Sequence, residues 1–143
     1  MVRPRFETSR DLANEESLME KILNSSYENH DAKKLPPQYY IDYMVMNSYG
    51  RPTRLIELKQ RNNNHNDFGT YIISLKKIIN GQRLADSIGI PFELAVRFND
   101  GDYMVELGNS QSWKVKWFER NNNRDGWDGE PVVHIPMSEF MRI

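Results

Sequence analysis

The sequence predicts an α/β fold of the α+β kind, in which helices pack on a mixed sheet. Two observations lead to this class. An amphipathic segment near the N-terminus is followed by two strand-like segments joined by a short turn, and a second helical segment comes next. Several further strand-like segments then follow up to the C-terminus. The order helix, hairpin, helix and further strands is typical of a sheet covered by helices.

Length and composition indicate an ordinary globular protein. The 143 residues suffice for one domain, and we expect residues 1–143 to form it. The net charge of −1 argues against a strong non-specific nucleic-acid binder, although it leaves room for a local basic patch. Cysteine is absent, so disulfides and thiolate metal sites are excluded. Because no segment resembles a membrane span or a signal peptide, we expect a cytoplasmic protein.

The first predicted helix covers residues 8–24. Thr8 or Ser9 can cap it, and its apolar stripe consists of Leu12, Leu18, Met19, Ile22 and Leu23. Glu15 falls near the middle of that stripe, where a carboxylate is costly unless it has a partner or a metal. Alternatively, its place near the helix start suits the helix dipole and leaves it close to solvent.

A polar loop and a hairpin are predicted to follow. Residues 25–38 contain Pro36-Pro37 and are expected to connect the helix to a strand over residues 39–47. A turn over residues 47–52 leads to a second strand, residues 53–61, which can pair antiparallel with the first.

The second strand carries an acid and a lysine on one face. Glu57 and Lys59 are two residues apart, so their side chains emerge side by side at about 7 Å. If the turn is centred near residues 49–50, Asp42 lies opposite Glu57, Leu58 or Lys59. Two of these three registers bring Asp42 to the face of Glu57 and Lys59. A plain cluster of ion pairs would show the same spacing.

A second helix is predicted over residues 68–80, ending at Gly81, with residues 82–87 forming a further turn. Its apolar face would consist of Phe68, Tyr71, Ile72, Leu75, Ile78 and Ile79. By helical periodicity, Thr70, Ser74 and Lys77 form an adjoining polar stripe. That stripe either flanks a polar site or faces solvent.

The remaining segments are predicted to be mostly strands. Strands are expected at residues 91–98, 103–107, 112–118 and 131–136, with a turn at residues 99–102 and a polar loop at residues 121–130. The three histidines show no pairing typical of zinc sites, and no phosphate-binding loop motif is present. Trp113, Trp117 and Trp127 are expected in the core or on a sheet face, with base stacking as the alternative for one of them.

The ordered set of Glu15, Asp42 and Glu57-x-Lys59, with a helix after it, resembles the PD-(D/E)xK nuclease superfamily. Further stretches are similar to small nuclease-like proteins of tailed phages: Phe6-Glu7-Thr8, Lys34-Leu35-Pro36, residues 57–62 and residues 70–77. The similarity covers about residues 6–98, and residues 99–143 would form a C-terminal strand extension. Ile41 stands where the superfamily usually has a proline before the acid.

This resemblance implies a restriction-endonuclease-like core and a divalent-metal site. Asp42, Glu57 and the main-chain carbonyl of Leu58 would hold Mg²⁺ or Mn²⁺. Lys59 would lie beside the attacking water, and Glu15 would position the water or a second ion. Three residues would contact substrate phosphate: Tyr71, Ser74 and Lys77.

The implied activity is metal-dependent hydrolysis of DNA phosphodiester bonds by a phage-related nuclease. The competing hypothesis is a catalytically inactive protein of the same fold that binds DNA or serves a structural role. DNA is the expected partner, in the host cytoplasm if the protein is phage-encoded. Because a chain of this size offers limited area for gripping a duplex, a homodimer or a larger complex is also expected.

Overall fold

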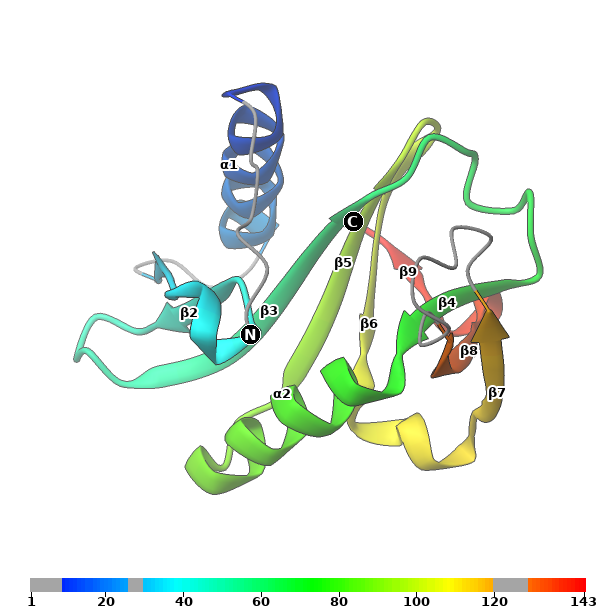
Figure 1. Ribbon diagram of the computed structural model, residues 1–143. Coiled ribbons are helices and arrows are strands. Elements are labelled where there is room, and N and C mark those ends of the chain that lie inside the picture. The colour runs from blue at the N-terminus through cyan, green and yellow to red at the C-terminus, as the bar shows by residue number, and fades with distance from the viewer. Residues whose placement is uncertain (1–8, 26–29, 120–128) are drawn as a thin grey trace.

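The computed structural model describes residues 9–25, 30–119 and 129–143, which form two helices and two sheets (Figure 1). The helices are α1 (Ser9–Ser25) and α2 (Leu75–Ile88). A six-stranded mixed sheet has the order β1 (Asp31–Lys34), β2 (Tyr43–Met46), β3 (Pro52–Gln60), β5 (Phe92–Phe98), β6 (Gly101–Glu106) and β9 (Met141–Arg142). A three-stranded antiparallel sheet has the order β4 (Thr70–Ser74), β8 (Gly129–Pro136) and β7 (Lys114–Glu119). Three short 3₁₀ turns are Pro37–Tyr39, Leu107–Ser112 and Met137–Glu139.

The two helices cover opposite faces of the six-stranded sheet. Alternate residues of β3 point to opposite faces, so Leu55 belongs to one core cluster and Ile56 to another. The cluster containing Leu55 includes Ile78 of α2, whereas the cluster containing Ile56 includes Leu18 of α1. This arrangement of mixed sheet and flanking helices confirms the predicted fold class.

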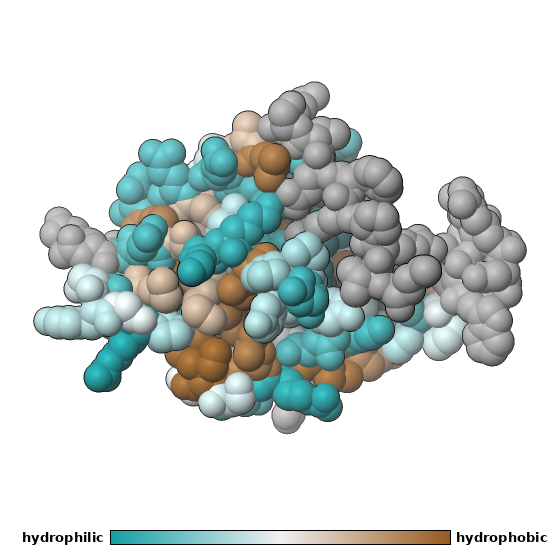
Figure 2. All heavy atoms as spheres, turned by 60° about the vertical axis from the view of Figure 1, so that its left-hand side comes forward, coloured by the Kyte–Doolittle hydropathy of each residue, from teal (hydrophilic) through white to brown (hydrophobic). Residues whose placement is uncertain are grey.

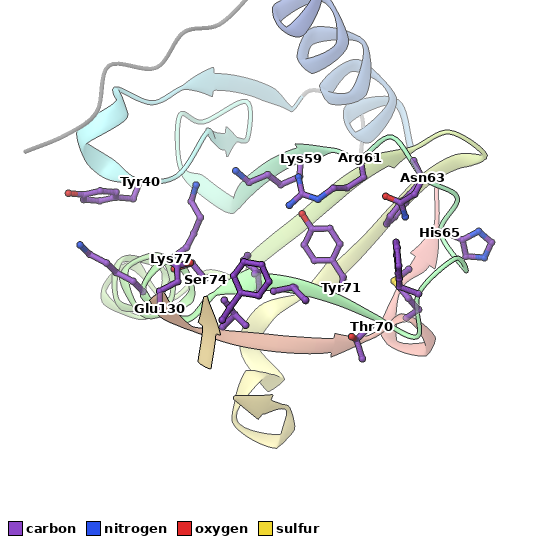
Figure 3. Close-up of a pocket in the computed structure, with 18 residues that line it drawn as sticks. Tyr40, Lys59, Arg61, Asn63, His65, Thr70, Tyr71, Ser74, Lys77 and Glu130 are labelled. Carbon is purple, nitrogen blue, oxygen red and sulfur yellow. The ribbon is translucent and has the colours of Figure 1, made fainter. Parts of the chain in front are cut away.

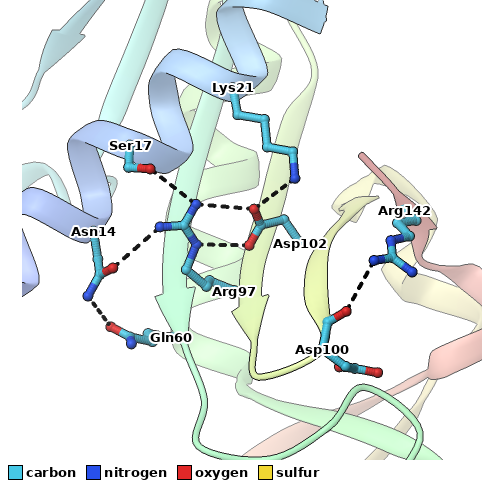
Figure 4. Close-up of polar contacts among 8 residues, drawn as sticks. All are labelled: Asn14, Ser17, Lys21, Gln60, Arg97, Asp100, Asp102 and Arg142. Carbon is cyan, nitrogen blue, oxygen red and sulfur yellow. Dashed lines mark hydrogen bonds and ion pairs between the residues drawn. The ribbon is translucent and has the colours of Figure 1, made fainter.

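Partly buried ion pairs join α1 to the sheet (Figure 4). Asp102 on β6 is 6% exposed and receives two hydrogen bonds from Arg97 of β5, at 2.9 and 3.2 Å. Lys21 of α1 lies 3.0 Å from the same carboxylate. Arg97 also donates to Asn14 and Ser17 of α1, both at 3.3 Å. The helix is therefore held by polar contacts as well as by its apolar stripe.

The predicted antiparallel hairpin is confirmed, with a shorter first strand. Tyr43 pairs with Ile56 and Met44 with Leu55, which is one of the three registers considered from the sequence. The strand begins at residue 43 because Pro36 and Pro37 start a 3₁₀ turn, which ends at Tyr40 in a left-handed conformation (φ 61°).

The prediction of a loop over residues 25–38 was wrong for one segment, which forms a strand. Residues 31–34 form β1, which pairs antiparallel with β2. Its sequence, Asp-Ala-Lys-Lys, has little strand propensity of its own, so the strand depends on pairing with β2.

The helix predicted over residues 68–80 was also wrong in its first half. Residues 70–74 form β4, whose Tyr71 and Ile73 are buried while Ile72 is exposed. This alternation is that of a strand, and β4 pairs with β8. The polar stripe predicted for Thr70, Ser74 and Lys77 on one helix therefore does not exist, because only Lys77 is helical.

The helix that does form, α2, runs through Gly81 rather than ending there. A Cβ atom at residue 81 would lie 2.2 Å from the ring of Phe92. Glycine is thus required for close approach of helix and sheet, and it does not act as a cap. The cap is Gly89, which has a φ of 81° and a backbone N–H that donates to Ala85.

The C-terminal strands largely agree with the prediction. The hairpin of β5 and β6 and the strands β7 and β8 are present. The predicted loop at residues 121–130 lies mostly outside the described residues, as does Trp127. Trp113 is buried, as expected for a core residue, whereas Trp117 is 66% exposed.

The face shown in Figure 2, on the side of α1 and β2, mixes hydrophilic and hydrophobic residues, with hydrophobic ones gathered toward its lower edge. None of the helices in the described residues is long and apolar enough to cross a membrane.

Candidate active site

Four charged residues gather where β2, β3 and α2 meet. Glu57 and Lys59 lie on β3 and face α2, as their alternation with Leu58 requires. Lys77 comes from α2 and Asp42 from the residue that precedes β2. The fold thus brings three separate segments of the chain together at this site.

Glu57 is the centre of this cluster. Its side chain is fully buried, and Lys77 Nζ donates to its Oε1 atom at 2.8 Å. Lys59 Nζ lies 3.8 Å from the same oxygen. The other oxygen, Oε2, is buried and has no hydrogen-bond partner among the described residues. A buried acceptor without a donor is unfavourable, so Oε2 is suited to receive a cation.

The Glu57 carboxyl is unusually hard to ionise without a cation. Burial, followed by the nearby negative charge of Asp42, raises the pKa of Glu57 to about 8, although Lys77 and Lys59 lower it. A protonated Glu57 can also donate a hydrogen bond to Asp42, which favours the neutral form further. A buried pair of acids with a perturbed pKa is a candidate functional site.

Asp42 is fixed against β3 although it lies outside a strand. It is 2% exposed, and its Oδ2 atom accepts a hydrogen bond from the backbone N–H of Leu58 at 2.8 Å. This contact places the carboxylate beside the Glu57-Leu58-Lys59 segment, where the hairpin register predicted it.

The donor set fits a hard divalent cation. Mg²⁺ typically binds one or two carboxylates and keeps several waters. Asp42 and Glu57 supply two carboxylates, and the Leu58 carbonyl lies in the same segment. Among the described residues no group of three or more His, Cys, Asp or Glu side chains could hold a metal, so water or substrate oxygens would complete the shell.

Glu15 lies on the other side of the sheet from α2, because α1 packs on the opposite face. It forms an ion pair with Lys34 of β1, 3.2 Å apart. After burial, the charges of Glu15 and Asp42 are among the causes that raise the pKa of Tyr43. Glu15 thus lies on the α1 face of the sheet and pairs with Lys34, whereas Glu57 and Lys59 face α2.

A cleft of about 750 Å³ is lined by Lys59 and Lys77 of the cluster (Figure 3). Lys59 extends from β3 on one side, and Ser74 and Lys77 come from the start of α2 on the other. Tyr71 lies between them, and its buried hydroxyl has no hydrogen-bond partner among the described residues. Burial raises the pKa of Tyr71 to about 12, so the hydroxyl stays protonated and can donate. The three residues expected to contact substrate therefore line one cleft.

Other cleft residues were not predicted from the sequence. Arg61 lines the cleft, with its guanidinium 5.0 Å from the centre of the Tyr71 ring. Continuing the alternation of Glu57 and Lys59 by two residues would have found it. Lys76 and three aromatic residues, Tyr40, Phe68 and Phe118, also line the cleft. The sequence around each of these residues does not predict a place in the cleft, because the residues come from separate segments that only the tertiary structure brings together.

Comparisons with known proteins agree with this architecture. The model of the family described as "Phage putative PDDEXK endonuclease" matches residues 1–143. Among solved structures, the chain is similar to Archaeoglobus fulgidus Hjc, a Holliday junction resolvase from an archaeal hyperthermophile. The TM-score is 0.56 at 12% identity, with 90% of each chain covered, so this likeness concerns the fold. No curated protein matches the chain. The predicted resemblance and fold class are thereby confirmed.

Proposed function

The chain belongs to the family of phage PD-(D/E)xK endonucleases, and we propose that it hydrolyses DNA phosphodiester bonds with the help of Mg²⁺ or Mn²⁺. The observation that carries the metal dependence is the pair of buried carboxylates, Asp42 and Glu57, with Glu57 Oε2 lacking a donor among the described residues. A phage nuclease of this kind would act in the host cytoplasm.

Asp42, Glu57 and the Leu58 carbonyl would hold the ion. Such an ion neutralises charge on the scissile phosphate and makes a nearby water more acidic. The hydrogen bond from Leu58 N–H, at 2.8 Å, fixes the Oδ2 atom of Asp42 beside β3. Lys77 fixes Glu57 in the same way through Oε1. Both acids are therefore oriented before a ligand arrives.

Lys59 would act on the attacking water. Its ammonium lines the cleft and lies 3.8 Å from Glu57 Oε1. It would orient that water and offset the negative charge that develops in the transition state. Glu15 would position the water or a second ion, the role that the resemblance to the superfamily implies for it. Ser74 and Tyr71 would donate to phosphate oxygens.

Cleavage assays test this proposal. Purified wild-type protein with Mn²⁺ or Mg²⁺ is expected to cut at least one of three labelled substrates: single-stranded, duplex or branched DNA. EDTA should stop the reaction, and Asp42→Asn and Glu57→Gln should lose it while keeping the wild-type circular dichroism spectrum. Lack of cleavage of all three substrates with both metals would contradict the proposal, as would full activity in either variant.

A specific observation favours the competing function, a DNA-binding or structural protein without turnover. Glu57 is completely buried, and Lys77 already occupies one of its oxygens at 2.8 Å. If that ion pair cannot rearrange, no metal binds. Mn²⁺ binding by the wild-type protein separates the two hypotheses, because only the nuclease requires it.

A further inference from the structure

The cleft lined by Lys59 and Lys77 combines positive charge with exposed aromatic rings. Four cations line it: Lys59, Arg61, Lys76 and Lys77. Three aromatic side chains line it as well, and all are substantially exposed: Tyr40 at 44%, Phe68 at 66% and Phe118 at 43%. Large aromatic rings left in water around one concave, basic surface indicate a ligand that has both charge and flat apolar faces.

The three-stranded sheet contributes apolar side chains to the cleft. One face of this sheet carries Ile72 of β4, Val132 of β8 and Phe118 of β7, because Ile72 is in register with His134 and Val132 with Lys116. All three residues line the cleft. The same face also carries the polar residues Ser74 and Glu130. The cations come from β3, the residue after it, and the start of α2. The second sheet therefore adds apolar and aromatic surface to a cleft whose cations come from other elements.

The aromatic rings reach the cleft from segments that are far apart in the chain. Phe68 comes from the loop before β4, Phe118 from β7 and Tyr40 from the turn before Asp42. Tyr40 holds a left-handed backbone conformation (φ 61°), which is unfavourable for a bulky residue. Its backbone N–H caps the 3₁₀ turn by donating to Pro37, and its side chain lies at the cleft (Figure 3).

The size of the cleft limits what can enter. Pockets that enclose small organic ligands have volumes of roughly 300–1,000 Å³. A cleft of about 750 Å³ is of that size. It fits one or a few nucleotides with splayed bases, whereas a stacked duplex offers no exposed base face to the aromatic rings. Phosphates would contact the cations, and unpaired bases would stack on the rings.

We propose that the cleft binds an unpaired DNA strand, so that the protein prefers single-stranded DNA, or single-stranded segments of branched DNA, over duplex. This inference rests on the proposed nuclease function and deepens it by naming the substrate class. Phe68 and Phe118 are specificity-determining residues on this account. The cations would contact the phosphate backbone of any DNA. The rings would stack only on unpaired bases, and so would distinguish unpaired from paired DNA.

Fluorescence anisotropy in EDTA tests the inference without requiring cleavage. Three labelled probes share one sequence: a single strand, the corresponding duplex and a fully paired four-way junction. We expect wild-type protein to bind the single strand most tightly. Phe68→Ala and Phe118→Ala should each weaken single-strand binding by on the order of tenfold, the loss typical of one stacked base. Duplex binding should stay within about twofold.

Control variants separate stacking from general damage. Tyr49→Ala removes an aromatic ring that is 88% exposed and is not among the residues that line the cleft, so it should bind all probes like wild type. Phe118→Trp keeps a ring and should restore single-strand affinity.

Three results would overturn the inference: no single-strand binding, tighter binding of the duplex or the paired junction, or equal losses on all probes in the Phe variants. These outcomes are independent of cleavage, so a wrong substrate class and an inactive site remain distinguishable.

Discussion

The ionisation of Glu57 depends strongly on the groups around its carboxyl. Its carboxyl is fully buried, and two lysines compensate its charge only in part, since its pKa lies at about 8. Natural proteins retain such unfavourable groups mainly where function requires them. The same burial strengthens any interaction of the carboxylate with a cation, because little water screens it.

Lys59 is expected to serve the chemical step rather than metal binding. Lys59→Ala should lower the cleavage rate by roughly 10²–10⁴-fold, the usual contribution of an acid–base group. Mn²⁺ should still bind, because both carboxylates remain. Single-turnover kinetics with saturating Mn²⁺ measure the rate.

Lys33→Ala, which changes an exposed lysine on β1, is the matched control and should cut at the wild-type rate. A Lys59→Ala protein as fast as wild type would refute the assigned role.

At the residue scale, the carboxylate pair could be predicted from local rules. Strand alternation placed Glu57 and Lys59 on one face, and two of the three hairpin registers considered brought Asp42 to them. Lys77 was also predicted near the site. That prediction used a polar helical stripe of Thr70, Ser74 and Lys77, and this stripe does not form because Thr70 and Ser74 lie on a strand. Tyr40 and Phe118 could not be predicted, because only tertiary structure brings these distant segments to the cleft.

Among the elements, β4 shows the limit of sequence periodicity. The run Tyr71-Ile72-Ile73 fits both a helix face and an alternating strand, since short apolar runs do not distinguish the two. Aromatic and β-branched residues favour the strand. The deciding interaction is pairing with β8, which lies some sixty positions further along the chain. Such a long-range partner leaves no local signal.

The attachment of α1 gives a prediction at the scale of elements. Burial alone would raise the pKa of Asp102, but hydrogen bonds from Arg97 and Lys21 outweigh it and hold the pKa below its usual value. Asp102→Asn should lower the free energy of unfolding at pH 7 by about 1–3 kcal/mol.

A lowered folded-state pKa stabilises the fold above the unfolded-state pKa of about 4, and this contribution disappears as the pH falls through the folded-state value. Urea unfolding at pH 7 and pH 3 measures the difference between the two proteins, which should shrink in acid. Glu106→Gln, an exposed acid on the same strand, should change little at either pH. An equal difference at both pH values would contradict the electrostatic explanation.

At the scale of the whole molecule, the chain forms two sheets that face one cleft. The last strand, β9, completes the six-stranded sheet beside β6, and β8 joins β4 to β7. The segment expected to form a C-terminal strand extension thus contributes β6 and β9 to one sheet and β7 and β8 to the other. We infer that the 143 residues act as one domain.

The central claim is that Asp42 and Glu57 hold a divalent metal ion that cleavage requires. Isothermal titration of Mn²⁺ into the wild-type protein and into Glu57→Gln tests it most directly. We predict that one Mn²⁺ binds per wild-type chain and that Glu57→Gln, which keeps the shape of the side chain but loses its charge, binds none at that site. Equal Mn²⁺ binding by both proteins, or no binding by wild type, would contradict the account.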